Sequence, residues 1–169
     1  LLQAFEINND RANLMKKNLQ RLNFKKNITV KNILKIKDKK KYDIVLLDAP
    51  CTSVGTIRRN PEIFYRKTIP DFKKIISKQN NLLDKAKLIV KKNGVIIYMV
   101  CSFLKEEGED QINLFLKKNK NYKLNHFKTK NKLYNRFINK NGSIYILPQK
   151  VDDQFFIDGF FAAKIIKYD

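Results

Sequence analysis

The chain has 169 residues, of which 43% are hydrophobic, and 36 lysines and arginines against 16 acidic residues give it a formal charge of +20. This length and apolar content suit one domain with a sizeable core, and they exclude a disordered tail. The charge favours a polyanionic partner such as a nucleic acid. Lysine, asparagine and isoleucine are abundant throughout the chain, however, so compositional drift in an AT-rich genome explains the charge equally well.

Cysteine and histidine are scarce. The two cysteines are far apart in sequence and His126 is the only histidine, which argues against a disulfide framework and a cysteine-rich zinc site, so no metal site is predicted. A cytoplasmic, reducing location fits this cysteine usage best. The sequence has no apolar run of about 18 residues and no signal-peptide pattern, so neither membrane insertion nor export is expected.

The first predicted unit is a strand from Leu1 to Ile7 followed by a helix that Asn8 or Asn9 can cap. Glu6 falls at the end of this strand, where an acid can bind the two hydroxyls of a cofactor ribose. Arg11 could reach the same cofactor, and the alternative for Glu6 is a solvated surface carboxylate. A strand at residue 1, without an initiator Met, indicates a chain that begins in the middle of a domain.

A second short strand, Ile28 to Val30, leads to Asn32, which falls where a side chain could bond the base of a cofactor. The next strand, Tyr42 to Leu47, is apolar except for Asp43 and too short for a helix, which predicts a strand buried on both faces. Pro50 ends it, because proline fixes φ and removes a backbone donor.

The stretch from Asp48 to Gly55 organises the rest of the chain, because it delivers a carboxylate and the Cys51 thiol directly after a buried strand. A second apolar strand, Gly94 to Val100, also ends in a thiol, at Cys101. Ligands of an open α/β sheet bind at the carboxyl ends of its strands. The alternative for each cysteine is a small buried hydrophobic residue.

The remaining elements form a scaffold without a linker or repeat, so residues 1–169 are predicted to be one domain. Arg58 and Arg59 suit bidentate phosphate contacts, with solvated surface charge as the alternative. Asp71 opens a long helix that should end in a turn over residues 91–94. The acidic residues 106–110 are expected to cap the following helix through its dipole, and residues 158–166 form a last strand.

The Asp48-Ala49-Pro50-Cys51 loop followed by Gly55, with a later strand ending in Cys101-Ser102, resembles the RNA cytosine-C5 methyltransferases of the RsmB/NOP2/Sun family. Further matches occur in the right order: Phe5-Glu6-Ile7 with Arg11, Gly55 with Arg58-Arg59, Gln79 with Leu82-Leu83 and Ala86, Gly94, Glu106-Glu107, and Pro148 with Asp158-Gly159-Phe160-Phe161. The resemblance implies an α/β, Rossmann-like, S-adenosylmethionine-dependent methyltransferase that acts on RNA, with ribosomal RNA as the expected substrate.

The resemblance also implies roles for single residues. Cys101 corresponds to the nucleophile that attacks C6 of cytosine, and Cys51 to the second cysteine that helps release the product. Asp48 corresponds to the acid that holds the cytosine edge near N3, and it borders the cofactor. Glu6, Arg11 and Asn32 fall on the cofactor side, although Asn32 stands where the family usually has Asp. The chemistry agrees, since C6 is a poor electrophile that requires a soft thiolate nucleophile and a base taken out of its stack.

The family's glycine- and lysine-containing cofactor loop, the strand before it and the upstream RNA-binding region are not in these residues. Residues 1–169 are therefore expected to be an N-terminally truncated catalytic domain, with the missing N-terminal segment of the same enzyme as a partner. In the family's strand order, the missing strand lies between those that end at Glu6 and Asp48. Two alternatives stay open: a non-catalytic RNA-binding remnant, and a different Rossmann-like methyltransferase acting on DNA or protein.

Overall fold

The computed structural model describes residues 2–24, 27–37, 40–68, 70–153 and 155–168. The chain forms two compact units, Leu1–Lys39 and Lys40–Asp169, and each is described here by itself. Leu1, the expected start of the first strand, lies outside the described residues. Within the described ranges, none of the helices combines the length and the apolar character that crossing a membrane requires.

The first unit is a parallel strand–helix–strand element. It consists of β1 (Ala4–Glu6), α1 (Asn9–Arg21), β2 (Ile28–Val30) and the short 3-10 turn η1 (Ile33–Lys35). The two strands pair in parallel from Ala4 opposite Ile28 to Glu6 opposite Val30. The Asn8 side chain accepts a hydrogen bond from the Arg11 N–H at 3.0 Å and caps α1. The predicted cap is confirmed.

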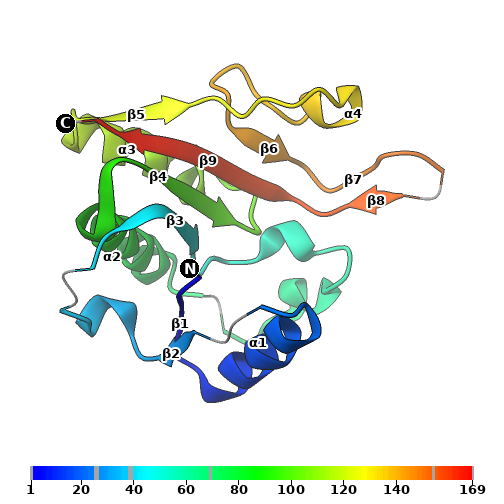
Figure 1. Ribbon diagram of the computed structural model, residues 1–169. Coiled ribbons are helices and arrows are strands. Elements are labelled where there is room, and N and C mark those ends of the chain that lie inside the picture. The colour runs from blue at the N-terminus through cyan, green and yellow to red at the C-terminus, as the bar shows by residue number, and fades with distance from the viewer. Residues whose placement is uncertain (1, 25–26, 38–39, 69, 154, 169) are drawn as a thin grey trace. The chain divides into compact units, whose positions relative to one another are not determined.

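The second unit contains a mixed five-stranded sheet (Figure 1). Strands β3, β4, β9 and β5 follow one another across it, and β6 also pairs with β9; β3 and β4 are parallel and the other pairs antiparallel. The elements in chain order are β3 (Tyr42–Asp48), the 3-10 turns η2 (Val54–Thr56) and η3 (Pro61–Tyr65), α2 (Phe72–Ile89), β4 (Val90–Val100), η4 (Lys105–Glu107), α3 (Glu109–Lys118), β5 (Tyr122–Asn125), α4 (Lys132–Asn135), β6 (Ile144–Ile146), β7 (Gln149–Lys150), β8 (Phe156–Ile157) and β9 (Phe160–Lys167).

Helices α2 and α3 pack on one face of this sheet, where the core of the unit lies (Figure 1). Leu83 of α2 and Phe115 of α3 meet Ile96 and Tyr98 of β4 and Ile165 of β9 in this core. Side chains alternate between the two faces of a strand, so every second residue of β4 points to the helices and is buried there. The predicted cap of the long helix is confirmed, because the Asp71 carboxylate accepts from the Lys74 N–H at 3.0 Å.

Two predictions about the strands are wrong. The expected turn over residues 91–94 lies inside β4, which begins directly at the end of α2; Asn93 takes a positive φ of 58° and the register with β3 shifts at this point. Strand β3 is not buried on both faces: Ile44 and Leu46 are 61% and 62% exposed. Val45 and Leu47 pack on the core, because α2 and α3 of this unit cover the face to which these two side chains point.

Candidate active site

Three chain segments are tied together at the carboxyl ends of β3 and β4. The Ala49 N–H donates to the Met99 carbonyl at 3.0 Å, and the Gly55 N–H donates to the Cys101 carbonyl at 3.1 Å. The Gly159 N–H donates in turn to the Gly55 carbonyl at 2.8 Å. A Cβ on Gly55 would lie 2.1 Å from the Gly159 carbonyl oxygen, so only glycine allows this approach. The loop after β3 is therefore fixed against the end of β4.

This arrangement brings the two cysteines together. The Sγ atoms of Cys51 and Cys101 lie 3.5 Å apart, and both residues are free thiols of intermediate burial. The hydroxyl oxygen of Ser53 lies 3.4 Å from the Cys101 sulfur and 3.9 Å from the Cys51 sulfur. Their placement after neighbouring strands predicted a shared site, and the structure shows the two thiols in contact.

The environment separates the acidities of the two thiols. The hydrogen bond with Cys51 lowers the pKa of Cys101 to about 6; burial opposes this, the Ser53 contact lowers the pKa further, and the Asp48 carboxylate raises it. The hydrogen bond with Cys101, burial and the charge on Cys101 raise the pKa of Cys51 well above its ordinary value, and the Glu107 carboxylate adds to this. The contact between the two thiols therefore favours the thiolate on Cys101 and the protonated thiol on Cys51.

Asp48 is the last residue of β3 and pairs in register with Met99. Its carboxylate is close enough to Cys101 to act on the ionisation of that thiol. The predicted trio of Asp48, Cys51 and Cys101 therefore lies at one end of the parallel pair of strands. Such a trio can offer a thiolate, a thiol and a carboxylate to the same substrate ring.

A buried carboxylate, that of Glu107, binds the loop that carries Cys51. This contact was not predicted from the sequence. Glu107 is fully buried; its Oε1 accepts from the Thr52 N–H at 2.8 Å and its Oε2 from the Thr52 hydroxyl at 2.6 Å. Gln79 donates both to Glu107 Oε1 at 3.3 Å and to the Pro50 carbonyl at 3.0 Å. The expected dipole-capping role is therefore wrong for Glu107, whereas Glu109 and Asp110 do lie in the first turn of α3.

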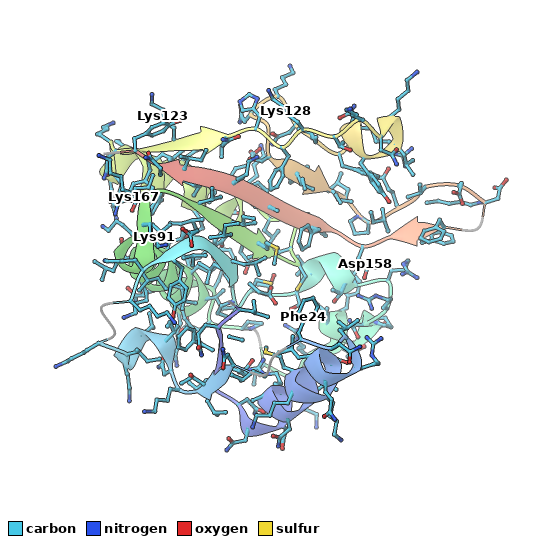
Figure 2. All side chains as sticks on the ribbon, in the orientation of Figure 1. Phe24, Lys91, Lys123, Lys128, Asp158 and Lys167 are labelled. Atoms are coloured by element: carbon cyan, nitrogen blue, oxygen red, sulfur yellow. The ribbon has the colours of Figure 1, made fainter. Side chains whose placement is uncertain are left out.

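Arg58 and Arg59 follow the loop and share one carboxylate. Arg58 lies 3.2 Å and Arg59 2.5 Å from the two oxygens of Asp158, which precedes β9 and is labelled in Figure 2. Both arginine side chains stay exposed, at 42% and 62%, while that of Asp158 is 18% exposed. A guanidinium has five N–H donors, so pairing with Asp158 leaves donors for a phosphate. No local signal in the sequence predicts that Asp158 lies beside them, because it is about 100 residues away in the chain.

Three of the four residues predicted to bind the cofactor, Glu6, Arg11 and Asn32, lie in the first unit, whereas the fourth, Asp48, ends β3 in the second unit. Glu6 Oε1 accepts from the N–H groups of Ile7 at 2.7 Å and Asn8 at 2.9 Å, and Arg11 approaches it to 3.1 Å. Burial acts to raise the pKa of Glu6, but these three partners outweigh it and hold the pKa below its usual range. Asn32 uses its side-chain oxygen to accept from the Leu34 N–H at 3.0 Å, which caps η1.

Solved structures identify the fold as that of the Rossmann-like methyltransferases. The crystal structure of PH0851 superposes with a TM-score of 0.81 at 32% identity, covering 98% of this chain and 36% of that one. A methyltransferase homologue from Pyrococcus horikoshii superposes with a TM-score of 0.73 at 27% identity, covering 99% of this chain and 53% of that one.

Residues 1–166 match the family described as 16S rRNA methyltransferase RsmB/F, and the chain belongs to this family. Ribosomal RNA small subunit methyltransferase B of Photorhabdus laumondii is 31% identical over 168 residues, which cover 97% of this chain and 36% of the relative. The protein of the same name from Yersinia enterocolitica is 32% identical, with the same coverage of 97% and 36%. The chain thus spans little more than a third of these relatives' length.

Proposed function

We propose that this chain carries the catalytic thiols of an S-adenosylmethionine-dependent methyltransferase that modifies C5 of a cytosine in RNA, with ribosomal RNA as the substrate. The observation that carries the proposal is the 3.5 Å contact between Cys51 and Cys101 at the ends of two parallel strands. Family membership and the names of the relatives support the methyl transfer and the RNA. A remnant that only bound RNA would have no use for two thiols in contact, one with a lowered pKa and one with a raised pKa.

The first step needs a thiolate at neutral pH, and Cys101 supplies it. With a pKa of about 6, its sulfur is mostly ionised at pH 7. The thiolate adds its electron pair to C6 of the cytosine, and the ring electrons move to C5, which becomes nucleophilic. Asp48 would hold the N3 edge of the base in its protonated form, because only a donor stabilises the negative charge that develops at N3. When bound, S-adenosylmethionine would supply the methyl group that C5 takes up.

The second step releases the product, and it follows from the coupling between the thiols. Cys101 is the largest cause of the raised pKa of Cys51, through its hydrogen bond and then its charge. When Cys101 is bonded to carbon, it no longer carries that charge, so the pKa of Cys51 falls and its proton can leave. The Cys51 thiolate then takes the proton from C5, the C5–C6 double bond re-forms, and the Cys101 thiolate is expelled.

Glu6, Arg11 and Asn32 would hold S-adenosylmethionine. The carboxylate of Glu6 stays ionised at the carboxyl end of β1, and three donors fix its Oε1. An ionised, oriented carboxylate at a strand end suits the two hydroxyls of a ribose. Asn32, after β2, keeps an amide NH2 group that could bond an adenine nitrogen. The residues present therefore fit the cofactor.

Basic side chains support RNA as the substrate. Lys123, Lys128 and Lys167 lie on the β5 side of the sheet (Figure 2), and they contribute to a formal charge of +20. Arg58 and Arg59 add two exposed basic side chains shortly after the thiol-bearing loop. Lysine and arginine that neutralise phosphates release counterions, so binding should weaken steeply with salt.

The proposal includes an N-terminal segment of the same enzyme as a partner of β3. Within the described residues β3 pairs only with β4, and its Ile44 and Leu46 side chains are more than 60% exposed. A sheet edge without a neighbouring strand is a template for another strand, and the exposed Ile44 and Leu46 lie on the face of β3 opposite the core. The relatives, of which this chain covers 36%, have the length to supply one.

The direct test uses the chain fused behind the N-terminal part of the Yersinia enterocolitica relative, called here the completed chain. It is incubated with methyl-labelled S-adenosylmethionine and 16S rRNA, and the digested nucleosides are identified by mass spectrometry. We expect label in 5-methylcytidine, and none with the Cys101→Ala variant. Label on another nucleoside or on protein, or unchanged labelling by the variant, would overturn the proposal.

A further inference from the structure

Ser53 adopts a backbone conformation that serine rarely takes. Its φ of 62° and ψ of 18° lie in the left-handed region, at the start of η2. A side chain costs free energy there, whereas glycine does not. The Ser53 carbonyl accepts from the N–H and the hydroxyl of Thr56, both at 2.9 Å, and the Ser53 side chain makes no capping hydrogen bond. The turn is therefore held without the serine hydroxyl.

The hydroxyl instead lies against the thiol pair. Its oxygen is 3.4 Å from the Cys101 sulfur, which donates to it when protonated, and 3.9 Å from the Cys51 sulfur. When Cys101 loses its proton, a rotation of the hydroxyl is enough to turn the O–H toward the thiolate. A hydrogen bond to an ionised acceptor is stronger than one between neutral groups.

We propose that Ser53 is a catalytic residue whose hydroxyl donates to the Cys101 thiolate and stabilises its charged form. This inference rests on the proposed function, in which Cys101 is the nucleophile. The strained backbone at residue 53 is the cost of placing an O–H beside the sulfur.

Charged and polar groups act on both sulfurs, and the Ser53 N–H also donates to the Cys51 sulfur, which favours a thiolate there. Asp48, at the end of β3, faces Cys101 with a carboxylate that disfavours the thiolate, while Glu107, from η4, disfavours a thiolate on Cys51. Cys51 and Ser53 oppose the effect of Asp48 through hydrogen bonds to Cys101. Cys51 must give up its own proton during product release, whereas the Ser53 hydroxyl can remain a donor throughout the cycle.

The test measures the ionisation of Cys101 in the completed chain without RNA or cofactor. The rate of iodoacetamide alkylation at Cys101 is followed against pH by peptide mass spectrometry in Ser53→Gly and Ser53→Ala variants. Loss of one hydrogen bond to a charged group should raise the midpoint by about one pH unit. Ser53→Gly should also unfold at the same or a higher temperature, because glycine relieves the strain.

Asn93→Gly is the matched control, since Asn93 also has a positive φ, of 58°, and lies in β4 away from the thiols. It should change stability as Ser53→Gly does, without moving the midpoint. An unmoved midpoint in Ser53→Gly, or midpoints that differ between Ser53→Gly and Ser53→Ala, would overturn the inference. Because the readout needs no methyl transfer, a shifted midpoint in a chain that forms no 5-methylcytidine would refute the proposed function and the catalytic role of Ser53, and would leave only the hydrogen bond from Ser53 to the Cys101 thiolate.

Discussion

Replacing Glu107 by alanine tests whether the buried carboxylate holds the cysteine loop. The change removes the acceptors of the Thr52 N–H at 2.8 Å and the Thr52 hydroxyl at 2.6 Å, whereas Gln79 keeps the Pro50 carbonyl at 3.0 Å. Each hydrogen bond to a charged group contributes about 1.5–3 kcal/mol. We therefore expect a loss of about 3–6 kcal/mol in the free energy of unfolding, a large part of the ~5–15 kcal/mol typical of a domain.

Two further variants should lose less of the free energy of unfolding than Glu107→Ala does. Glu107→Gln keeps one oxygen for the Thr52 N–H, and the Thr52 hydroxyl can turn to accept from the new amide, so its loss should be about half that of Glu107→Ala. Glu106→Ala removes a neighbouring exposed carboxylate and should stay within about 0.5 kcal/mol of the unchanged protein. Urea unfolding of the completed chain measures all three. Equal effects of Glu107→Ala and Glu106→Ala would refute the role given to Glu107.

Three more predictions follow from the site and the sheet. Alanine at both Arg58 and Arg59 should weaken RNA binding and reduce, by up to about two, the slope of log binding constant against log salt concentration. Asp158→Asn frees both guanidinium groups and should strengthen binding. An unaltered slope in the double alanine variant would assign the two arginines to surface charge. Alkylation of Cys101 should rise as pH increases through about 6, since the thiolate forms above its pKa, whereas a midpoint near 8.5, the ordinary thiol value, would contradict the site electrostatics. Residues 1–169 alone should neither bind S-adenosylmethionine measurably nor unfold cooperatively in calorimetry, and both properties should return in the completed chain; a sharp transition with micromolar binding by residues 1–169 would show that β3 needs no added strand.

Local signals in the sequence predicted much of the fold. The caps Asn8 and Asp71 were predictable because each needs only neighbouring backbone donors. The pairing of Cys51 with Cys101 was predictable because parallel strands end at the same edge of a sheet. In each case the signal lies within one element or follows from one rule of topology.

The remaining features depend on contacts between distant segments. Glu107 lies 55 residues from Thr52, and nothing local distinguishes it from its exposed neighbour Glu106. Asp158 meets Arg58 from 100 residues away. The exposed face of β3 could not be predicted from its apolar composition, because composition does not say which face the helices cover. The role inferred for Ser53 could not be predicted from the sequence, because it depends on a positive φ that only the structure shows.

The central claim is that Cys101 attacks the cytosine and Cys51 releases it, and trapping the covalent intermediate tests this claim most directly. The completed chain is mixed with S-adenosylmethionine and RNA and examined on a denaturing gel. The account predicts that Cys51→Ala accumulates a protein–RNA adduct, because the C5 proton cannot be removed, and that Cys101→Ala and the double variant form none. A stable adduct with Cys101→Ala would contradict it.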